Sequence, residues 1–239
     1  MPHLTTSAGI QWEYRMDQPD HSDDLATIVF LHGWGVDRRI WRQQVKYFSE
    51  SFRVLTVDLP GHGKTSWQPM NLEGFARQFI ELIERIEARP FTAVGSSLGG
   101  LFFLKVYSIH AALFDRFIFV GSMPKFAKSE EYPYGLDIRR IRKLGGQLET
   151  SYPSIVNVFF RSLFTKEERE SRRYKWLQKF KQKDDVPMKP ALASYLDILE
   201  AEDLRSVLKE VSQPIQFING RDDEICCRDT VQYLRECCP

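Results

Sequence analysis

The stretch FTAVGSSLGG, residues 91–100, decides the fold of this chain. It begins with the apolar residues of a buried strand and runs directly into an apolar helical stretch, LFFLKVY. Between the two stands Gly95-x-Ser97-x-Gly99, the spacing of a sharp strand-to-helix turn that exposes a serine hydroxyl. Glycines flank the serine because such a turn brings neighbouring main chain too close for side chains. The pattern predicts that Ser97 is a nucleophile.

The residues around this turn indicate how negative charge would be held. The amide of Leu98, at the start of the helix, would donate to an oxyanion at the positive end of the helix dipole. A second strand, IVFLHGWG at residues 28–35, also ends in small residues, and the amide of Trp34 would be the second donor. The Trp34 ring either lines a pocket for the acyl chain or only packs against neighbouring side chains. His32 is expected to hold this loop through hydrogen bonds.

The segment VDLPGHGKT, residues 57–65, is a third strand followed by a Pro-Gly-His-Gly turn. Its composition is typical of a fixed loop, so His62 is expected to be structural. A dinucleotide-binding loop is excluded at residues 95–99, because the G-x-x-x-G spacing is not G-x-G-x-x-G.

Strand-like runs alternate with helical patterns along the chain, which is typical of a mostly parallel sheet covered by helices. Helices are expected at residues 40–48 and 71–88. Residues 122–213 contain no convincing strand and are expected to form an inserted helical cap, unless they are one long crossover. The expected organisation is a core at 1–121, a cap at 122–213 and the rest of the core at 214–239. The expected strands are 10–15, 27–31, 54–58, 91–94, 116–120 and 215–219.

Composition narrows the function classes. The 239 residues are 43% apolar and 27% charged, with a net charge of +1, so bulk electrostatics give no reason to expect nucleic-acid binding. The N-terminus lacks the pattern of a secretory signal, and no apolar run approaches the ~20 residues that span a bilayer. The cysteines form two adjacent pairs, which favours reduced thiols in a cytosolic protein over a disulfide framework or a metal site. They are Cys226, Cys227, Cys237 and Cys238.

The segments LHGWG, VDLPGHGKT and GSSLGG, in this order, resemble the α/β-hydrolase family. With VGSMPKF at residues 120–126 and LDILEAEDLR at 196–205, the chain most resembles the pimeloyl-acyl-carrier-protein methyl ester esterases of biotin biosynthesis. The resemblance implies a cytoplasmic, monomeric serine hydrolase without a cofactor, acting on a methyl ester carried by acyl carrier protein, with no nucleic-acid or membrane partner. A small-ester hydrolase, a carbon–carbon hydrolase and a non-catalytic binding protein on the same scaffold remain alternatives.

The segment PIQFINGRDDEICC, residues 214–227, resembles the strand that delivers the acid of a catalytic triad. The family pattern of a glycine with the acid three residues on selects Asp223, with Asp222 as the alternative. In this fold the triad histidine follows the acid by roughly 25 residues, after a further helix and strand. Only residues 224–239 follow Asp223, and all the histidines precede it: His3, His21, His32, His62 and His110.

Three explanations of the missing histidine are open. The sequence is a truncated version of a longer hydrolase, or another residue such as His32 or His62 is the base, or the protein binds a ligand without catalysis. Loss of one triad member leaves only residual catalysis, so we expect the chain as given to hydrolyse esters very weakly.

Two segments of the expected cap carry candidate binding residues. The apolar stretch PSIVNVFFRSLF, residues 153–164, resembles the part of the esterase cap that lines the acyl chain, although its aromatic residues would also suit a cap core. The acyl-lining residues by this resemblance are Phe159, Phe160, Arg161, Ser162 and Leu163.

Residues 166–183 then carry eight basic and three acidic residues. This segment is either a solvated face or a surface that steers an acidic carrier protein to the pocket. The steering residues would be Arg172, Arg173, Lys175 and Lys179.

Overall fold

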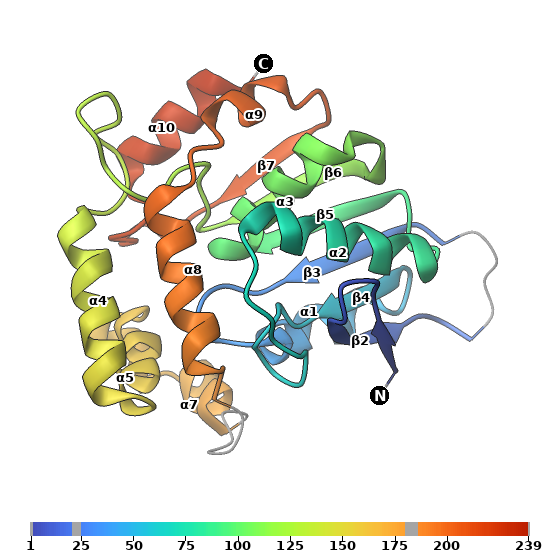
Figure 1. The fold of residues 1–239 in the computed structure, drawn as a ribbon, viewed down its shortest axis with the longest axis horizontal. Helices are drawn as coiled ribbons and strands as arrows, with labels where there is room; N and C mark the ends of the chain where they lie inside the picture. Colours follow the sequence, from blue (N-terminus) through green and yellow to red (C-terminus); the bar gives the residue numbers. More distant parts are fainter. Residues whose placement is uncertain (1, 21–24, 180–185, 239) are drawn as a thin grey trace.

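The computed structural model describes residues 2–20, 25–179 and 186–238 (Figure 1). Within them, seven strands form one sheet in the order β1-β2-β4-β3-β5-β6-β7. The strands from β4 to β7 in this order pair in parallel, while β1 and β2 are antiparallel to their neighbours. The mostly parallel α/β sheet predicted from the sequence is therefore confirmed. The strands are β1 (His3–Thr5), β2 (Gln11–Asp17), β3 (Thr27–Leu31), β4 (Arg53–Val57), β5 (Phe91–Ser96), β6 (Phe114–Val120) and β7 (Ile215–Ile218).

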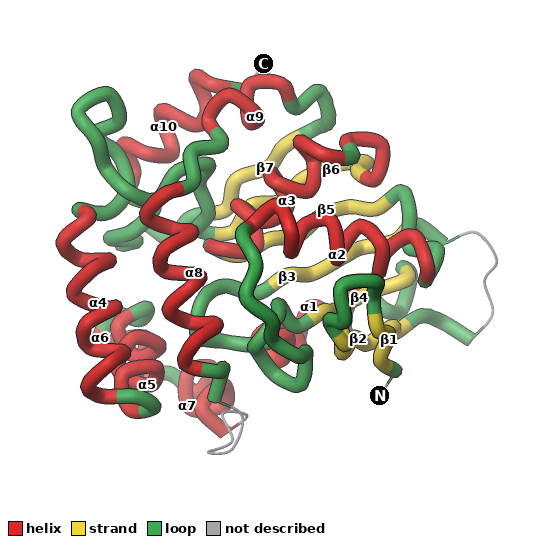
Figure 2. Tube along the Cα trace, in the orientation of Figure 1, coloured by secondary structure: helices red, strands yellow, loops and turns green. Residues whose placement is uncertain are grey.

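Helices cover both faces of the sheet (Figures 1 and 2). The side chains of β3 alternate, so Val29 and Leu31 join one apolar cluster while Ile28 and Phe30 join the other. The larger cluster packs against α2 (Leu72–Arg85) and α3 (Leu98–Ile109). The smaller one packs against η1 (Arg38–Trp41) and α1 (Arg42–Phe48).

Helix α2 forms within residues 71–88, where the apolar spacing of the sequence predicted a helix. Asn71 caps it by accepting a hydrogen bond from the Gly74 amide, which satisfies one of the free donors of the first turn. Its apolar side chains recur at three- and four-residue spacing and are all buried against the sheet. These buried residues are Leu72, Phe75, Ala76, Phe79, Ile80, Leu82 and Ile83.

A helical layer stands over the carboxyl ends of the parallel strands, to the left of the sheet in Figure 1. Helix α8 joins it to the core, because the Met188 amide donates to Gly61 O and the Tyr195 ring packs 5.6 Å from that of Phe75. The layer consists of α4 (Ile138–Ser151), α5 (Ser154–Ser162), α6 (Lys166–Glu170), α7 (Arg172–Lys179) and α8 (Lys189–Ala201).

The last two helices belong to the core. Helix α9 (Arg205–Glu210) packs against α3, and the Tyr107 hydroxyl of α3 donates to Glu210 O at its end. The region 122–213, expected to be cap throughout, therefore includes a helix that covers the sheet. After β7 the chain forms α10 (Arg228–Cys237). No helix among the described residues combines the length and the apolarity needed to cross a membrane.

Candidate active site

Ser97 occupies the turn between β5 and α3 in a strained conformation. Its φ of 51° and ψ of −117° lie where residues other than glycine are rarely found, and such a backbone costs about 1–3 kcal/mol. The turn is held from both sides, since the Ser97 amide donates to Val120 O at 3.0 Å and the Ser122 hydroxyl donates to Ser97 O at 2.6 Å. Ser122 is a buried residue that the sequence did not single out; its only sequence signal is the segment VGSMPKF.

Close approach of the main chain explains the glycines around Ser97. A Cβ atom on Gly95 would stand 2.6 Å from Gly100 Cα, and one on Gly99 would stand 2.7 Å from His32 O. Real Cβ atoms do not approach other atoms this closely, so both positions exclude a side chain. The second contact also brings the start of α3 against the end of β3.

Two amides beside Ser97 are available to an oxyanion. A Cβ on Gly33 would stand 3.2 Å from Ser97 Cβ, so the loop after β3 lies against the serine. The Trp34 amide in this loop has no hydrogen-bond partner among the described residues. Leu98 is the first residue of α3, where a backbone N–H has no acceptor within the helix. Both predicted donors therefore lie next to Ser97, and their role in holding an oxyanion stays a prediction.

Asp223 follows β7 and points back toward the sheet. Its Oδ1 accepts hydrogen bonds from the Ile225 amide at 2.8 Å and the Cys226 amide at 2.9 Å. Its Oδ2 has no partner among the described residues and would stand 3.3 Å from a Cβ on Gly121, the residue after β6. Asp222 is exposed to solvent. The structure thus favours Asp223 over Asp222 as an acid that faces the site.

Ser97, Gly121 and Asp223 follow the adjacent parallel strands β5, β6 and β7, whose carboxyl ends meet at one edge of the sheet. Two strand spacings separate the serine's strand from the acid's strand, roughly 10 Å. Such a span has room for one intervening group between hydroxyl and carboxylate. A nucleophile elbow, an adjoining pair of amides and an acid two strands away form the arrangement of a hydrolase site.

Comparison with known proteins agrees with this geometry. The family model described as "alpha/beta hydrolase fold" matches residues 26–239. The chain belongs to this family. The solved structure of an esterase, EaEST from Exiguobacterium antarcticum, superposes with a TM-score of 0.87 over 98% of this chain and 86% of its own, at 21% identity. That likeness confirms the α/β-hydrolase fold.

Two curated relatives of this α/β hydrolase carry one name, pimeloyl-acyl-carrier-protein methyl ester esterase. The protein of Nitrosomonas europaea is 28% identical over 212 residues, covering 89% of this chain and 83% of its own. That of Wigglesworthia glossinidia brevipalpis is 30% identical over 200 residues, covering 83% of this chain and 75% of its own.

The two histidines nearest the elbow of this α/β hydrolase are buried and bound to main chain. His32 is fully buried, with Nδ1 2.9 Å from Gly33 O and Nε2 3.0 Å from the Leu59 amide, so both nitrogens are occupied. His62 lies 4.9 Å from His32 between ring centroids, and burial lowers its pKa to about 3. Neither ring suits the role of a base, which agrees with the structural role expected for both.

No described histidine bonds the nucleophile. Ser97 Oγ has no hydrogen-bond partner in residues 2–20, 25–179 and 186–238. His3 lies in β1, and His110 caps the end of α3, about 20 Å along that helix from Ser97. His21 lies outside the described residues. The described part of this α/β hydrolase therefore contains the predicted nucleophile, oxyanion donors and acid, and their roles stay predictions.

The helical layer of α4 to α8, which corresponds to the predicted cap, contacts the candidate site at Trp34. This side chain is only 3% exposed, its Nε1 donates to Leu192 O of α8 at 2.9 Å, and its ring packs edge-on against Phe159 of α5, 4.7 Å between centroids. Phe160 instead packs inside the cap against Phe164, 5.2 Å away. The run expected to line the acyl chain is thus divided, and only Phe159 contacts a residue of the site in the described structure.

The other three residues of that run do not turn toward the core. Arg161 and Ser162 are exposed, and 43% of Leu163 is accessible to solvent. The Ser162 hydroxyl donates back to Phe159 O at 2.7 Å. Helix α5 ends at Ser162, and Leu163 caps it.

The basic segment of the cap forms α6 and α7. Arg172, Arg173 and Lys175 are exposed on α7. Lys179 ends this helix, and its side chain lies outside the described structure. The helical pattern thus leaves at least three of the four expected cations in solvent, where a partner could meet them.

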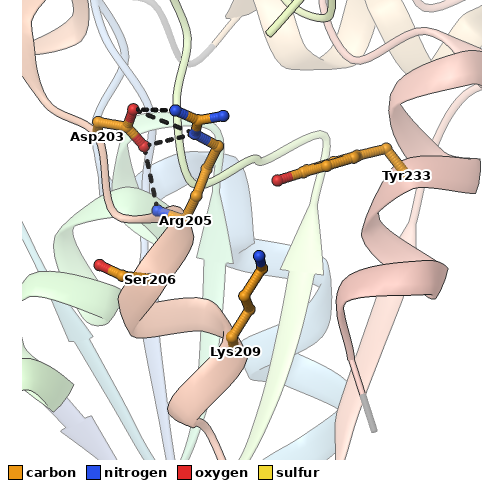
Figure 3. A pocket seen from close by; sticks show the side chains of 5 residues that line it. All are labelled: Asp203, Arg205, Ser206, Lys209 and Tyr233. Atoms are coloured by element: carbon orange, nitrogen blue, oxygen red, sulfur yellow. Dashed lines mark hydrogen bonds and ion pairs between the residues drawn. The ribbon is translucent and has the colours of Figure 1, made fainter. Parts of the chain in front are cut away.

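A separate hollow of about 540 Å³ opens between α9 and α10 (Figure 3). Both oxygens of Asp203 accept hydrogen bonds from Arg205, and Lys125 Nζ lies 2.9 Å from Oδ2. None of its lining residues is a candidate catalytic residue. They are Asp203, Arg205, Ser206, Lys209 and Tyr233.

The cysteines do not form a metal site in the described structure. All four thiols are free, and no group of three or more histidine, cysteine, aspartate or glutamate side chains there could hold a metal ion. Cys226 is buried with Sγ 3.5 Å from Ser122 O, and burial raises its pKa to about 12. This thiol is therefore a packing residue beneath the turn that carries Asp223.

Proposed function

We propose that this protein is a serine carboxylesterase that hydrolyses the methyl ester of a pimeloyl group carried on acyl carrier protein. The observation that carries the proposal is the strained Ser97 turn with the unpartnered Trp34 amide and the Leu98 amide beside it. Relatives that bear the name of this esterase, up to 30% identical over most of the chain, support the choice of substrate.

The reaction begins at the ester carbonyl carbon. Ser97 Oγ forms a bond to that carbon as its proton leaves to a base, which no described residue provides within hydrogen-bonding distance of Oγ, and the carbonyl oxygen becomes an oxyanion. The Trp34 and Leu98 amides donate to this oxyanion, with the N-terminal end of the α3 dipole behind Leu98. When the tetrahedral intermediate collapses, the carbon–oxygen bond to the methoxy group breaks and the methoxy oxygen takes the proton, releasing methanol.

A water molecule completes the cycle. It attacks the acyl-enzyme carbon while its proton moves to the same base, the oxyanion forms again, and Ser97 leaves with that proton. The product is a free carboxylate at the end of the pimeloyl chain. Asp223 stabilises positive charge on the base from across β6, and the two amide bonds to its Oδ1 keep Oδ2 available for that role.

The cap and its basic helix α7 support the choice of an acyl chain carried on an acidic protein as the substrate. The partly buried Phe159 ring packs against the buried Trp34 ring beside the loop that adjoins Ser97, and its remaining apolar surface suits an aliphatic acyl chain. Arg172, Arg173 and Lys175 present positive charge on the exposed surface of α7. An acidic carrier protein would be steered to that charge, which raises the rate of encounter and is screened by salt.

The test is methanol release from the methyl ester of pimeloyl-acyl carrier protein. The protein is compared with Ser97→Ala, and with Ser108→Ala as a matched control on the exposed part of α3. We expect turnover above the uncatalysed rate in the protein and in Ser108→Ala, and none in Ser97→Ala. Equal rates in the protein and in Ser97→Ala would refute the esterase assignment.

A non-catalytic binding protein is the second candidate function. It is favoured by Ser97 Oγ having no hydrogen-bond partner in the described residues, because an activated serine normally bonds its base. A fluorophosphonate probe separates the two candidates. An esterase is labelled at Ser97, whereas a binding protein retains the carrier-bound ester without labelling and without methanol release.

A further inference from the structure

His32 makes two hydrogen bonds that fix its protonation state. The Gly33 carbonyl can only accept, so Nδ1, 2.9 Å away, must carry a proton. The Leu59 amide can only donate, so Nε2, 3.0 Å away, must be unprotonated. The two bonds together require the neutral ring with its proton on Nδ1. The side chain is fully buried.

The first of these bonds acts on the peptide group that carries an oxyanion donor. Gly33 C=O and Trp34 N–H belong to one planar peptide, which is trans, so they point in opposite directions. A bond that holds the carbonyl on the His32 side therefore holds the N–H on the other side. The Gly33 position adjoins Ser97, and the Trp34 N–H has no partner among the described residues.

Neighbouring groups keep the ring in place. Asp58 Oδ1 lies 3.7 Å from His32 Nε2, beyond hydrogen-bonding distance, and instead accepts from the Arg38 amide at 2.7 Å. The Arg38 guanidinium pairs with Asp58 Oδ2 and lies 3.0 Å from Glu13 Oε1. The Asp58 carboxylate is thus held by Arg38, which leaves Nε2 to the Leu59 amide. The imidazole ring therefore connects the loop after β3 with the loop after β4 through its two hydrogen bonds.

We propose that His32 is a positioning residue that sets the direction of the Trp34 N–H, and so the strength of the oxyanion hole. The inference rests on the proposed function, since it assigns Trp34 an oxyanion to receive. It gives His32 a role in the rate of the chemical step rather than in substrate affinity. An oxyanion forms only in the reaction, so a misdirected donor lowers kcat and leaves KM almost unchanged.

Two substitutions separate the two hydrogen bonds of His32. In His32→Asn the amide nitrogen falls near the position of Nδ1 and can still donate to Gly33 O. In His32→Gln the amide reaches toward the position of Nε2 and Leu59 instead. Both remove the ring, so both lower thermal stability, and each serves as the folding control of the other.

Kinetics on the pimeloyl methyl ester give the first readout. We expect His32→Gln to lower kcat about 10- to 100-fold, with KM within about threefold, because losing one oxyanion donor costs roughly 10²- to 10³-fold. His32→Asn is expected to recover most of that loss. Equal losses of kcat in the two variants, in proportion to their loss of Tm, would show a merely structural histidine.

NMR spectroscopy gives a second readout that needs no turnover, so failure of the esterase assignment would not hide the result. The ¹⁵N shifts of His32 should show a protonated Nδ1 and an unprotonated Nε2. A nuclear Overhauser effect from the Trp34 amide proton to the Ser97 side chain should be present in the protein and in His32→Asn, and lost in His32→Gln. A proton on Nε2, or an unchanged effect in His32→Gln, would overturn the proposal.

Discussion

The carboxylate of Asp223 lies against Gly121, where a Cβ atom would stand 3.3 Å from Oδ2. Gly121 follows β6, the strand between that of Ser97 and that of Asp223, and its φ of 54° suits glycine. The acid therefore reaches toward the nucleophile across the one strand end that has no side chain to obstruct it.

The carboxylate of Asp223, and not that of Asp222, should matter for catalysis. Asp223→Asn keeps the size and the two backbone bonds but loses the charge that would stabilise a protonated base, so we expect the weak kcat of this chain to fall about 10-fold or more. Asp222→Asn, at the exposed neighbouring position, should stay within about twofold. Methanol release measures both variants. A larger loss in Asp222→Asn would reverse the choice of acid.

Gly95 should tolerate no side chain. In Gly95→Ala the new methyl group would meet Gly100 Cα at 2.6 Å, and overpacking of this kind costs about 1–3 kcal/mol. Gly146→Ala is the matched control, because nothing lies within 4 Å of a Cβ there and the residue is in the middle of α4. That change should raise the free energy of unfolding by about 0.5–1 kcal/mol. Urea unfolding followed by circular dichroism compares the two.

Phe159 should contribute to substrate binding. Phe159→Ala removes apolar ring surface that would contact the acyl chain, and losing contact with one or two methylene groups, at about 0.8 kcal/mol each, should raise KM about 4- to 15-fold. Val158→Ala on the same helix alters a side chain that is 61% exposed and should leave KM unchanged. Steady-state kinetics on methyl pimelate measure KM for both variants. Equal KM values for the two variants would place the acyl chain elsewhere.

His62 should make the fold sensitive to acid. Burial lowers its pKa to about 3 from an ordinary 6.5, so between these values the unfolded chain binds a proton that the native state does not. Its contribution to stability is therefore complete above pH 6.5 and is lost as the pH falls toward 3. Between pH 7 and pH 5 the free energy of unfolding should drop by about 1–2 kcal/mol more in the protein than in His62→Gln. His110→Gln, at a partly exposed site, should keep the drop of the parent protein.

The cations of α7 should affect only the carrier-bound substrate. Replacing Arg172, Arg173 and Lys175 together by Glu should lower kcat/KM for the carrier-bound ester about 10-fold at low ionic strength. The deficit should shrink as salt is added, because the Debye length falls from about 10 Å at 0.1 M to about 3 Å at 1 M. Rates on free methyl pimelate should not change. An equal loss on both substrates would mean that the cap itself was damaged.

Much of the fold was predictable because it depends on local pattern. The predicted strand at residues 27–31 matches β3 (Thr27–Leu31), and the other five predicted strands overlap β2, β4, β5, β6 and β7. The spacing of apolar residues predicted α2, and the glycines around Ser97 predicted the sharp turn between β5 and α3. The antiparallel strand β1 was missed because its three residues are too short to show alternation.

The candidate site was predictable in part. The motif predicted Ser97, Leu98 and Trp34 because each follows a strand end directly. The choice of Asp223 needed the turn at Ile225 and Cys226, whose amides orient one of two adjacent carboxylates. The sequence also could not predict that Phe159 contacts Trp34 while Phe160 packs inside the cap. Both residues are aromatic, and only the tertiary packing decides which partner each one contacts.

Taken alone, the amino-acid sequence determined where the chain forms strands and helices and where it must turn without side chains, because these depend on residues close together in the chain. Only the tertiary structure decided which strand ends meet, that Ser122 holds the Ser97 carbonyl and that His32 holds the peptide before Trp34. Those contacts join residues on different strand ends or depend on the direction of one peptide group. Both are set by how the sheet, its helices and the cap pack together.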